Sequence, residues 1–337
     1  MPIMTYRDAL NDALHLEMAR DRNVIVLGED VSGGAGGTSG KREASGGIFG
    51  VTNGLLPKFG EGRVLDTPIS ESAIIGAANG AALAGKRPVA EIMFADFIGV
   101  CMDQLVNQAA KFRYMFGGKS RTPIVVRMTM GAGMNCAAQH SQTFYPMITA
   151  VPGLKCVIPS TPADAKGLLM TAIRDDDPVV FFEHKSLYGT KGEVPEGEYL
   201  VPFGKASLVR QGDDATVVTV GRMVRFSEKA ADGLQKDGIG IDLIDLRTTS
   251  PLDEEAILDS VEKTGRVVIV DESPPRCGLA ADIASIVARK AFSSLKAPIE
   301  TVTAPHTPVP YARELERAYV PSPADIAAAV KRTLEYR

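Results

Sequence analysis

Residues 66–85 read DTPISESAIIGAANGAALAG, and this stretch organises the first half of the chain. Pro68 disfavours helix in the residue before it, and Ser70 can cap the free amides of a helix that starts at Glu71. Glycine and alanine then recur at helical spacing with almost no side-chain bulk. The pattern predicts a helix that is buried on most sides and lets another backbone come very close.

The carboxylate at the start of this helix has two interpretations. Glu71 lies in the first turn, where a carboxylate commonly does no more than complement the helix dipole. In an element buried on most sides, however, little water would solvate the group, and it could share a proton with a ligand. The spacing alone leaves both interpretations open.

Helices and buried apolar runs alternate on both sides of this stretch. The predicted strands are residues 23–28, 87–94, 123–128, 154–159 and 178–183, and the predicted helices are residues 6–21, 95–111 and 162–173. Strands that alternate with helices form parallel sheets. Residues 1–188 are therefore expected to form one α/β domain.

A second domain is expected after a break in the pattern. Periodicity is lost over residues 189–205, where glycine and proline collect, and this marks a linker. Beyond it, strands are predicted at residues 215–220, 241–246 and 266–271, with helices at 222–237 and 253–263 and a final helix from Pro323. Residues 206–337 are thus expected to form a second α/β domain with a parallel sheet.

Composition narrows the classes of function. The 337 residues, 45% of them hydrophobic and 23% charged, suffice for two domains with full cores. The net charge of −4 gives no basic excess, which argues against nucleic acid as a partner. No apolar run reaches the roughly 20 residues that span a bilayer, and no leader precedes the first helix. The expectation is a cytoplasmic chain without a membrane partner.

The cysteines do not form a recognisable metal or disulfide motif. Cys101, Cys136, Cys156 and Cys277 stand far apart, with no CxxC pair, among apolar or small residues. This pattern favours reduced core thiols over disulfides or metal ligands.

Polar or aromatic residues follow several of the predicted strands. Glu29 and Asp30 come directly after strand 23–28, at the carboxyl end where open α/β sheets place ligand groups. Phe97 follows strand 87–94, and His140 lies in the motif Gln-His-Ser-Gln at residues 139–142. Taken singly, these have plainer interpretations as a solvated carboxylate, a core ring and a surface histidine.

Together with residues 66–85, these motifs resemble the beta subunits of the thiamine-diphosphate-dependent component of 2-oxo acid dehydrogenase complexes, most closely those of the acetoin dehydrogenase type. The resemblance covers essentially the whole chain. It implies a transketolase-type fold, with a pyrimidine-binding domain followed by a carboxy-terminal domain. Residues 31–50, expected to form a mobile loop, carry a Gly-Gly-Ala-Gly run that favours the acetoin type.

The resemblance also implies roles for individual residues. Glu71 would be catalytic, hydrogen-bonded to the aminopyrimidine ring of thiamine diphosphate. Phe97 would lie against the face of that ring, and Glu29 would belong to the same cofactor-binding neighbourhood. His140 would be the second catalytic residue, exchanging protons with the reacting groups or with the dithiolane sulfur.

A potassium site is implied in the same way. It would be held chiefly by backbone carbonyls at Ile124, Ala172, Ile173, Asp175 and Asp177. Without the resemblance, residues 174–177 read as a solvated turn. Carbonyl oxygens suit a weakly polarising cation, so the resemblance makes this a structural ion.

One motif is missing. Thiamine enzymes usually carry a Gly-Asp-Gly segment that holds magnesium on the diphosphate, and this chain has none. The resemblance implies an alpha subunit that supplies this half of the site in an α2β2 heterotetramer. The assembly would cleave acetoin on thiamine diphosphate, release acetaldehyde, and pass the acetyl unit to a lipoyl-bearing acyltransferase core.

Three alternatives remain open. A similar subunit could serve pyruvate or branched-chain 2-oxo acids with the same cofactor. The chain could instead be a non-catalytic assembly subunit, although the presence of Glu71, Phe97 and His140 together argues against that. A nicotinamide dehydrogenase is disfavoured because no strand is followed by GxGxxG and a later acidic residue.

Overall fold

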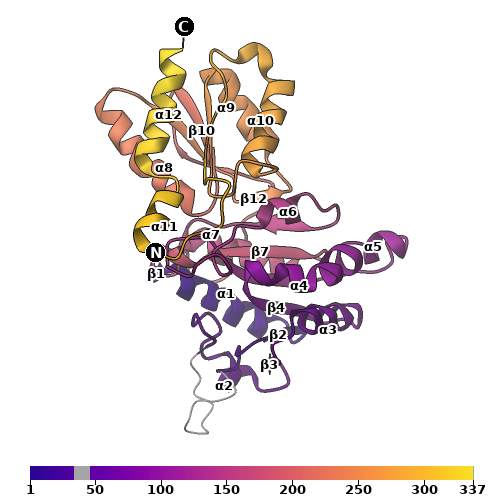
Figure 1. Cartoon of the computed structure of the whole chain (residues 1–337). Coiled ribbons are helices and arrows are strands. Elements are labelled where there is room, and N and C mark those ends of the chain that lie inside the picture. The colour runs from indigo at the N-terminus through magenta and orange to yellow at the C-terminus, as the bar shows by residue number, and fades with distance from the viewer. Residues whose placement is uncertain (34–45, 337) are drawn as a thin grey trace. The chain divides into compact units, whose positions relative to one another are not determined.

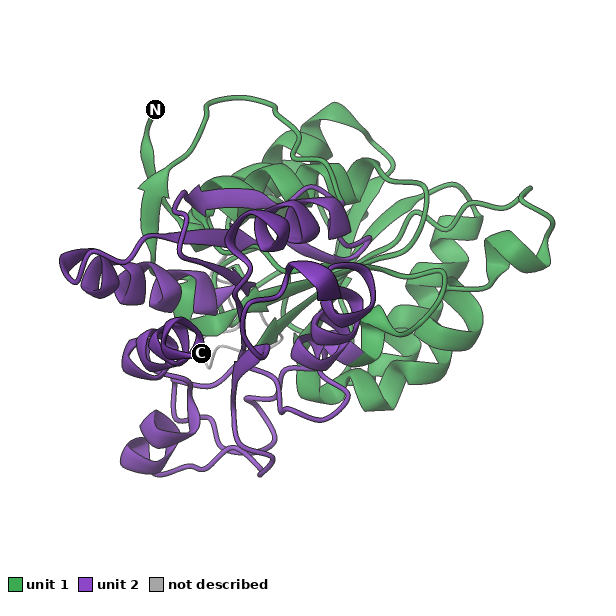
Figure 2. Cartoon of the chain, turned by 90° about the horizontal axis from the view of Figure 1, so that it is seen from above, with its two compact units in different colours: residues 1–130, 147–203 green, residues 131–146, 204–337 purple. Residues whose placement is uncertain are grey.

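The computed structural model describes residues 1–33 and 46–336, which divide into two compact units (Figures 1 and 2). The first unit contains residues 1–130 and 147–203, and the second contains residues 131–146 and 204–337. Residues 131–146, which the sequence pattern places in the first domain, group with the second unit. The glycine-rich run expected to form a mobile loop lies largely within residues 34–45, outside the described residues.

The first unit is built on a parallel sheet, as predicted. Its strands lie in the order β6, β7, β5, β4, β2, β3, and every neighbouring pair is parallel. Their bounds are β2 Val24–Gly28, β3 Val64–Asp66, β4 Arg87–Phe94, β5 Val125–Met130, β6 Lys155–Val157 and β7 Val179–His184. The central strands β4, β5 and β7 are buried almost throughout because helices cover the sheet.

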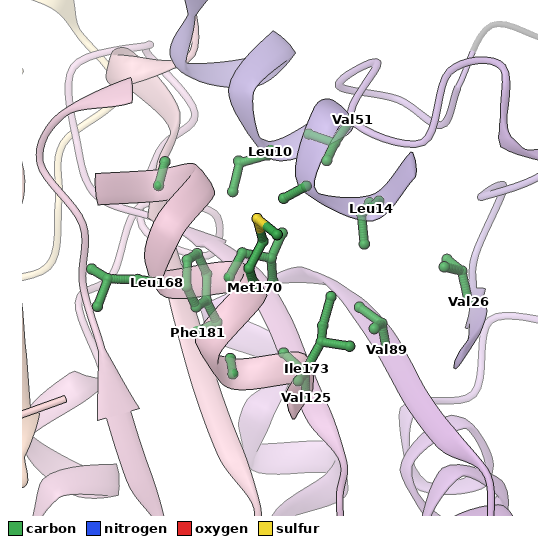
Figure 3. Close-up of a cluster of buried hydrophobic side chains, with 14 of the residues drawn as sticks. Leu10, Leu14, Val26, Val51, Val89, Val125, Leu168, Met170, Ile173 and Phe181 are labelled. Atoms are coloured by element: carbon green, nitrogen blue, oxygen red, sulfur yellow. The ribbon is translucent and has the colours of Figure 1, made fainter. Parts of the chain in front are cut away.

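Two helices form the main core of this unit. The helices α1 (Tyr6–Arg20) and α7 (Pro162–Arg174) pack side by side over the sheet, and Figure 3 shows Leu10 and Leu14 facing Met170 and Phe181. Both helices begin at threonine caps, whose hydroxyl groups accept hydrogen bonds from backbone amides two to three residues into the helix. The predicted boundaries of both helices are correct to within one residue.

The segment predicted as one helix over residues 95–111 is instead several short turns. It consists of a 3-10 turn η1 (Ala95–Phe97), α4 (Ile98–Asp103) and a π-helical turn η2 (Gln104–Ala109), followed by α5 (Phe112–Met115). The π-helical turn lies beside α3 (Glu71–Leu83), where the Gln104 carbonyl accepts a hydrogen bond of 2.8 Å from the Asn79 side chain. Such turns often occur near functional sites.

The expected linker contains a strand. β8 (Lys191–Glu193) pairs in antiparallel fashion with β1 (Ile3–Thr5) at the amino terminus, so the end of the first unit is fastened to its beginning. The remaining short elements of the chain are α2 (Leu55–Phe59), α6 (Tyr145–Thr149), η3 (Lys185–Leu187), β12 (Thr248–Ser250) and η4 (Phe292–Ser294).

The second unit is also an α/β layer structure, which confirms the predicted fold class. Its strand order is β14, β13, β10, β11, β9, and all pairs are parallel except the antiparallel edge strand β9. The strands are β9 Ser207–Arg210, β10 Ala215–Thr219, β11 Ile241–Asp245, β13 Val267–Asp271 and β14 Glu300–Thr303. The helices are α8 Arg222–Lys236, α9 Glu254–Thr264, α10 Leu279–Lys290, α11 Arg313–Tyr319 and α12 Pro323–Glu335.

Two further expectations can be compared with the structure. None of the helices in residues 1–33 and 46–336 is both long and apolar enough to cross a membrane. All four cysteines are free thiols, as predicted, but only Cys101 and Cys156 are buried. The expectation of core thiols is therefore wrong for Cys277, which is exposed, and for Cys136, which is half-buried.

Candidate active site

The site in the first unit is built where β2 ends and α3 begins. The amide of Thr67 donates to the Gly28 carbonyl at 2.9 Å, and the amide of Ser32 donates to the Asp66 carboxylate at 2.6 Å. Gly28 must be glycine here, because a Cβ would come within 2.8 Å of the Glu91 carbonyl oxygen. These contacts fix the two segments that carry Glu29 and Glu71.

The charge of Glu71 acts on the carboxyl group of Glu29. Both carboxylates are half-buried. Burial raises the pKa of Glu29, and the negative charges of Asp30 and Glu71 raise it further. The structure therefore brings the two predicted carboxylates into one neighbourhood. A carboxyl group whose pKa is raised beside a second acid, as that of Glu29 is, favours a site that retains and shares a proton.

Cys101 of α4 lies in the same neighbourhood. Burial raises the pKa of its thiol to about 12, and the charge of Glu71 adds to the effect. A thiol that stays neutral at physiological pH is a poor nucleophile. Cys101 therefore contributes apolar volume beside Glu71.

The surroundings of α3 differ from the sequence expectation. Only one side of the helix is buried, through residues such as Ile75 and Ala78, while Ala73, Ala77 and Gly80 are exposed on the other. Ser70 makes no side-chain capping bond. The predictions of a helix buried on most sides and of a Ser70 cap are therefore wrong for the single chain, because β4 and the π-helical turn cover one side of α3 only.

Phe97 is part of a row of aromatic rings. Its ring meets Phe94 edge-on, with centroids 5.7 Å apart and an interplanar angle of 83°. Phe94 meets Phe49 in the same way at 5.8 Å, and Phe49 lies 5.5 Å from Tyr188. All four rings are half-buried, so the row leaves part of its aromatic surface accessible, including that of Phe97.

A buried ion network, not predicted from the sequence, lies close to Glu29. Arg127 of β5 donates to Glu183 of β7 at 2.6 and 2.8 Å and to Glu91 of β4 at 2.7 Å. Tyr188 donates to the same Glu183 carboxylate at 2.7 Å. Burial raises the pKa of Glu91, Arg127 opposes this rise, and the charge of Glu29 contributes to it. The sequence feature that could have indicated this network is a charged residue in the interior of each of three strands, Glu91, Arg127 and Glu183.

A buried hydroxyl group four residues before Glu71 has no hydrogen-bond partner in the described structure. Thr67 Oγ1 is buried without a hydrogen bond, in the segment between β3 and α3. Buried hydroxyls normally bond to protein, water or ligand. An orphaned hydroxyl, two carboxylates and a half-buried aromatic row fit a nitrogen heteroaromatic ring, which offers polar edges and a flat apolar face.

The remaining predicted catalytic residue belongs to the second unit. His140 is half-buried in the loop 131–146, and the neighbouring Ser141 hydroxyl is buried without a hydrogen-bond partner in the described chain. Glu29, Glu71 and Phe97 belong to the first unit, so each unit carries part of the predicted set.

Carboxylates of the second unit hold the loop that carries His140. The amide of Ala132 donates to Glu272 at 2.8 Å, and the amide of Gly133 donates to Glu316 at 2.7 Å. At the other end of the loop, the Tyr145 hydroxyl donates to Asp271. Burial raises the pKa of Asp271, although hydrogen bonds from Ser273 and Tyr145 oppose the rise.

The predicted potassium ligands lie in the first unit, and four of their five carbonyls already accept hydrogen bonds. The Ile173 carbonyl accepts from Arg87 at 2.7 Å, and the Asp175 carbonyl accepts from the same guanidinium group. The Ile124 carbonyl accepts from the Val179 amide at 2.9 Å, and the Ala172 carbonyl from the Asp175 amide at 3.3 Å.

The side chains of the same turn are engaged in ion pairs. Lys155 lies 2.6 Å from Asp175 and 3.6 Å from Asp177, and Arg113 lies 2.5 Å from Asp177. Within the described residues, no three His, Cys, Asp or Glu side chains gather as a metal site. A carbonyl oxygen has two lone pairs, so it can accept a hydrogen bond and still coordinate an ion. The potassium site at these five residues therefore stays a prediction.

Comparisons with known proteins agree with this architecture. Residues 3–191 match the transketolase pyrimidine binding domain, and residues 204–326 match the transketolase C-terminal domain. The chain resembles the solved structure of a split gene transketolase, an inactive beta4 tetramer, with a TM-score of 0.78 at 21% identity over 99% of both chains. At that identity the likeness supports the fold alone.

Other proteins share far more of their sequence with this chain than that transketolase does. The chain is 58% identical to the acetoin:2,6-dichlorophenolindophenol oxidoreductase subunit beta of Cupriavidus necator and 54% identical to that of Bacillus subtilis, over 97% of this chain and 96% of each relative. It is 46% identical to the 2-oxoisovalerate dehydrogenase subunit beta of Bacillus subtilis over the full length of both. The chain therefore belongs to the family of dehydrogenase beta subunits that join a transketolase pyrimidine binding domain to a transketolase C-terminal domain.

Proposed function

We propose that this chain is the beta subunit of an acetoin dehydrogenase. With an alpha subunit it would cleave acetoin on thiamine diphosphate, release acetaldehyde and transfer the acetyl unit to a lipoyl group. The pairing of Glu29 with Glu71 at the start of α3 carries the catalytic part of the proposal. The higher identity to acetoin subunits than to the 2-oxoisovalerate subunit favours acetoin over a branched-chain 2-oxo acid.

The protein's part in this chemistry is proton control. Thiamine diphosphate, when bound, supplies the carbanion chemistry. Glu71 would hold a proton at N1' of the aminopyrimidine ring, and the neighbouring Glu29, with its raised pKa, would keep the pair from carrying two full charges. Phe97 would lie against the face of the ring, and Thr67 offers an unused hydroxyl beside it.

His140 is proposed as the second proton-transfer group. Its loop is held by Glu272 and Glu316, so the imidazole is carried on an anchored backbone. A histidine so held can exchange a proton with the oxygen of the substrate or with a dithiolane sulfur of the lipoyl group.

The other half of the site is assigned to a partner. No Gly-Asp-Gly segment occurs in the sequence, so the alpha subunit would hold magnesium and the diphosphate in an α2β2 heterotetramer. The exposed small-residue side of α3 supports a close contact with another chain. A lipoyl-bearing acyltransferase core would accept the acetyl unit.

We also propose that potassium binds at the carbonyls of Ile124, Ala172, Ile173, Asp175 and Asp177. Arg87 already donates to two of these oxygens, so the ion would share them with the guanidinium group. The thermal midpoint should then be higher in potassium chloride than in sodium chloride at equal ionic strength, because an ion that binds only the folded state stabilises it. Equal midpoints in the two salts would exclude the ion.

The replacement Glu71→Gln tests the catalytic proposal directly. Glutamine keeps the volume of the side chain and part of its hydrogen bonding but cannot exchange a proton. Acetoin-dependent reduction of an artificial acceptor by the enzyme reconstituted with its alpha subunit should fall about 10²- to 10⁴-fold. The thermal midpoint and the assembly should stay close to those of the parent.

The matched control is Glu255→Gln, which removes an exposed first-turn carboxylate from α9. It should leave turnover unchanged. If Glu71→Gln turns over within a few-fold of the parent, Glu71 only complements the helix dipole, and the catalytic role assigned to this subunit fails.

A further inference from the structure

The second unit contains a cavity that the proposed reaction does not use. Its volume is about 330 Å³, and it opens between the first residues of the loop 131–146, helix α8 and helix α11. The residues that matter for its chemistry are Gly133, Arg222, Phe226, Arg313, Glu316 and Arg317. A cavity of this size accommodates a small molecule.

Three guanidinium groups and a single carboxylate line this cavity. The carboxylate, Glu316, is only 3% exposed, and it accepts hydrogen bonds from the amide of Gly133 at 2.7 Å and from the amide and side chain of Asn135 at 3.0 Å each. Its oxygens are therefore occupied by the loop. The cavity is left with an excess of positive charge.

The arginines themselves are only partly engaged. Arg222 donates to the Ala132 carbonyl at 2.8 Å and lies 4.7 Å over the ring of Phe226, which fixes the direction of its guanidinium group. Arg313 and Arg317 have no ion pair with any acid in residues 1–33 and 46–336. They stand four residues apart on α11, where like charges meet one turn apart and repel.

The geometry points to a binding site for a small phosphate-bearing molecule. Arginine presents a planar fork of donors that matches phosphate oxygens, and an anion between the three guanidinium groups would remove their repulsion. Phosphate offers three acceptor oxygens in different directions, which suits donors arriving from two helices better than a planar carboxylate does. Phe226 supplies an apolar surface for the remainder of the molecule.

Occupation of the cavity would act on the loop that carries His140. Gly133 and Asn135 form one side of the cavity, five to seven residues before the histidine. A Cβ at Gly133 would come within 2.6 Å of the Arg222 guanidinium group, so loop and arginine are packed tightly. A ligand that fixes Arg222 should therefore restrain the loop. This inference does not depend on the proposed function.

Calorimetry on the full chain tests the site, with inorganic phosphate as the probe and ionic strength held constant with chloride. The double variant Arg313→Gln/Arg317→Gln should weaken phosphate binding at least about tenfold. The control Arg289→Gln removes an exposed arginine from α10 of the same unit and should bind phosphate as the parent does. Because Arg313 and Arg317 are exposed, the variant should keep the thermal midpoint of the parent.

Hydrogen exchange supplies a second readout. Phosphate should slow exchange within residues 131–146 in the parent and in Arg289→Gln, but not in the double variant. Citrate at the same ionic strength should bind more weakly than phosphate. Phosphate affinity that is unchanged in the double variant would overturn the proposal. So would binding that disappears when the alpha subunit is added, because the cavity would then be part of a subunit interface.

Discussion

The most constrained side chain in the first unit is Arg127. It is 1% exposed and lies between two carboxylates, Glu91 and Glu183, which are themselves buried. The attraction among buried charges is largely offset by the cost of removing them from water, so such a network contributes little net stability. Removing the central cation, by contrast, leaves two buried carboxylates without a counter-charge.

Arg127→Met should therefore destabilise the chain by about 3–5 kcal/mol near neutral pH. Without the cation, Arg127 no longer opposes the effect of burial on Glu91, and the pKa of Glu91 stays above its value in the unfolded chain. Glu91 is then neutral at low pH, and stability is lost as the pH rises through its raised folded-state pKa. Urea denaturation should show a deficit that is larger at about pH 8 than at about pH 5.

The control for this experiment is Arg121→Met. Arg121 is 69% exposed and pairs with Asp176 at the surface, so its loss should cost less than about 1 kcal/mol at either pH. A deficit for Arg127→Met that does not change with pH would contradict buried, uncompensated carboxylates as its cause.

The residues of the site were only partly predictable from the sequence. Glu29 and Glu71 each lie at a recognisable junction, after a strand and at the start of a helix, but position alone left their interpretation open, and the resemblance supplied the predicted roles. Arg127 could not be paired with Glu91 or Glu183, because the three residues lie on different strands and Arg127 is 36 residues from Glu91 and 56 from Glu183. Strand order, which only the folded sheet specifies, brings them together.

Among the elements, α3 departs furthest from its sequence pattern. Small residues on every side predict burial, yet Ala73, Ala77 and Gly80 are exposed on one face. Sequence periodicity cannot distinguish burial within a chain from burial against another chain. The same limit applies to residues 95–111, where the side-chain pattern of one helix conceals a π-helical turn set by the contact between Gln104 and α3.

Ala77→Phe tests whether the exposed face of α3 is an interface. The side chain would point away from the core of the single chain, so the thermal midpoint of the isolated chain should change little. Close approach of another backbone would be blocked. Size-exclusion chromatography with light scattering, after mixing with the alpha subunit, should show loss of the heterotetramer.

A phenylalanine at an unrelated exposed alanine provides the control. Ala288 lies on the surface of α10 in the second unit, and Ala288→Phe should assemble as the parent does. If Ala77→Phe also assembles normally, the small residues of α3 serve some purpose other than contact with another chain.

At the scale of the whole molecule, the chain is two α/β units that each hold part of the predicted catalytic set. The alternation of strands and helices predicts both sheets, because that signal is local and repeats along the sequence. The grouping of residues 131–146 with the second unit was not predicted. It depends on Asp271, Glu272 and Glu316, which bind the loop from more than a hundred residues away.

The proposed division of the cofactor between chains leads to a prediction about the isolated protein. Glu29, Glu71 and Phe97 offer groups for an aromatic ring, whereas the sequence has no Gly-Asp-Gly segment, and no cluster of three potential metal ligands occurs in the described residues. Most of the affinity for thiamine diphosphate should therefore come from a magnesium-bound diphosphate held by the alpha subunit. Titration calorimetry should detect little binding to the pure chain, with or without magnesium, and magnesium-dependent binding after the alpha subunit is added. Tight, magnesium-dependent binding to the pure chain would mean that this chain holds the whole cofactor. An alpha subunit would then not be needed to bind magnesium and the diphosphate, and the argument for the heterotetramer would fail.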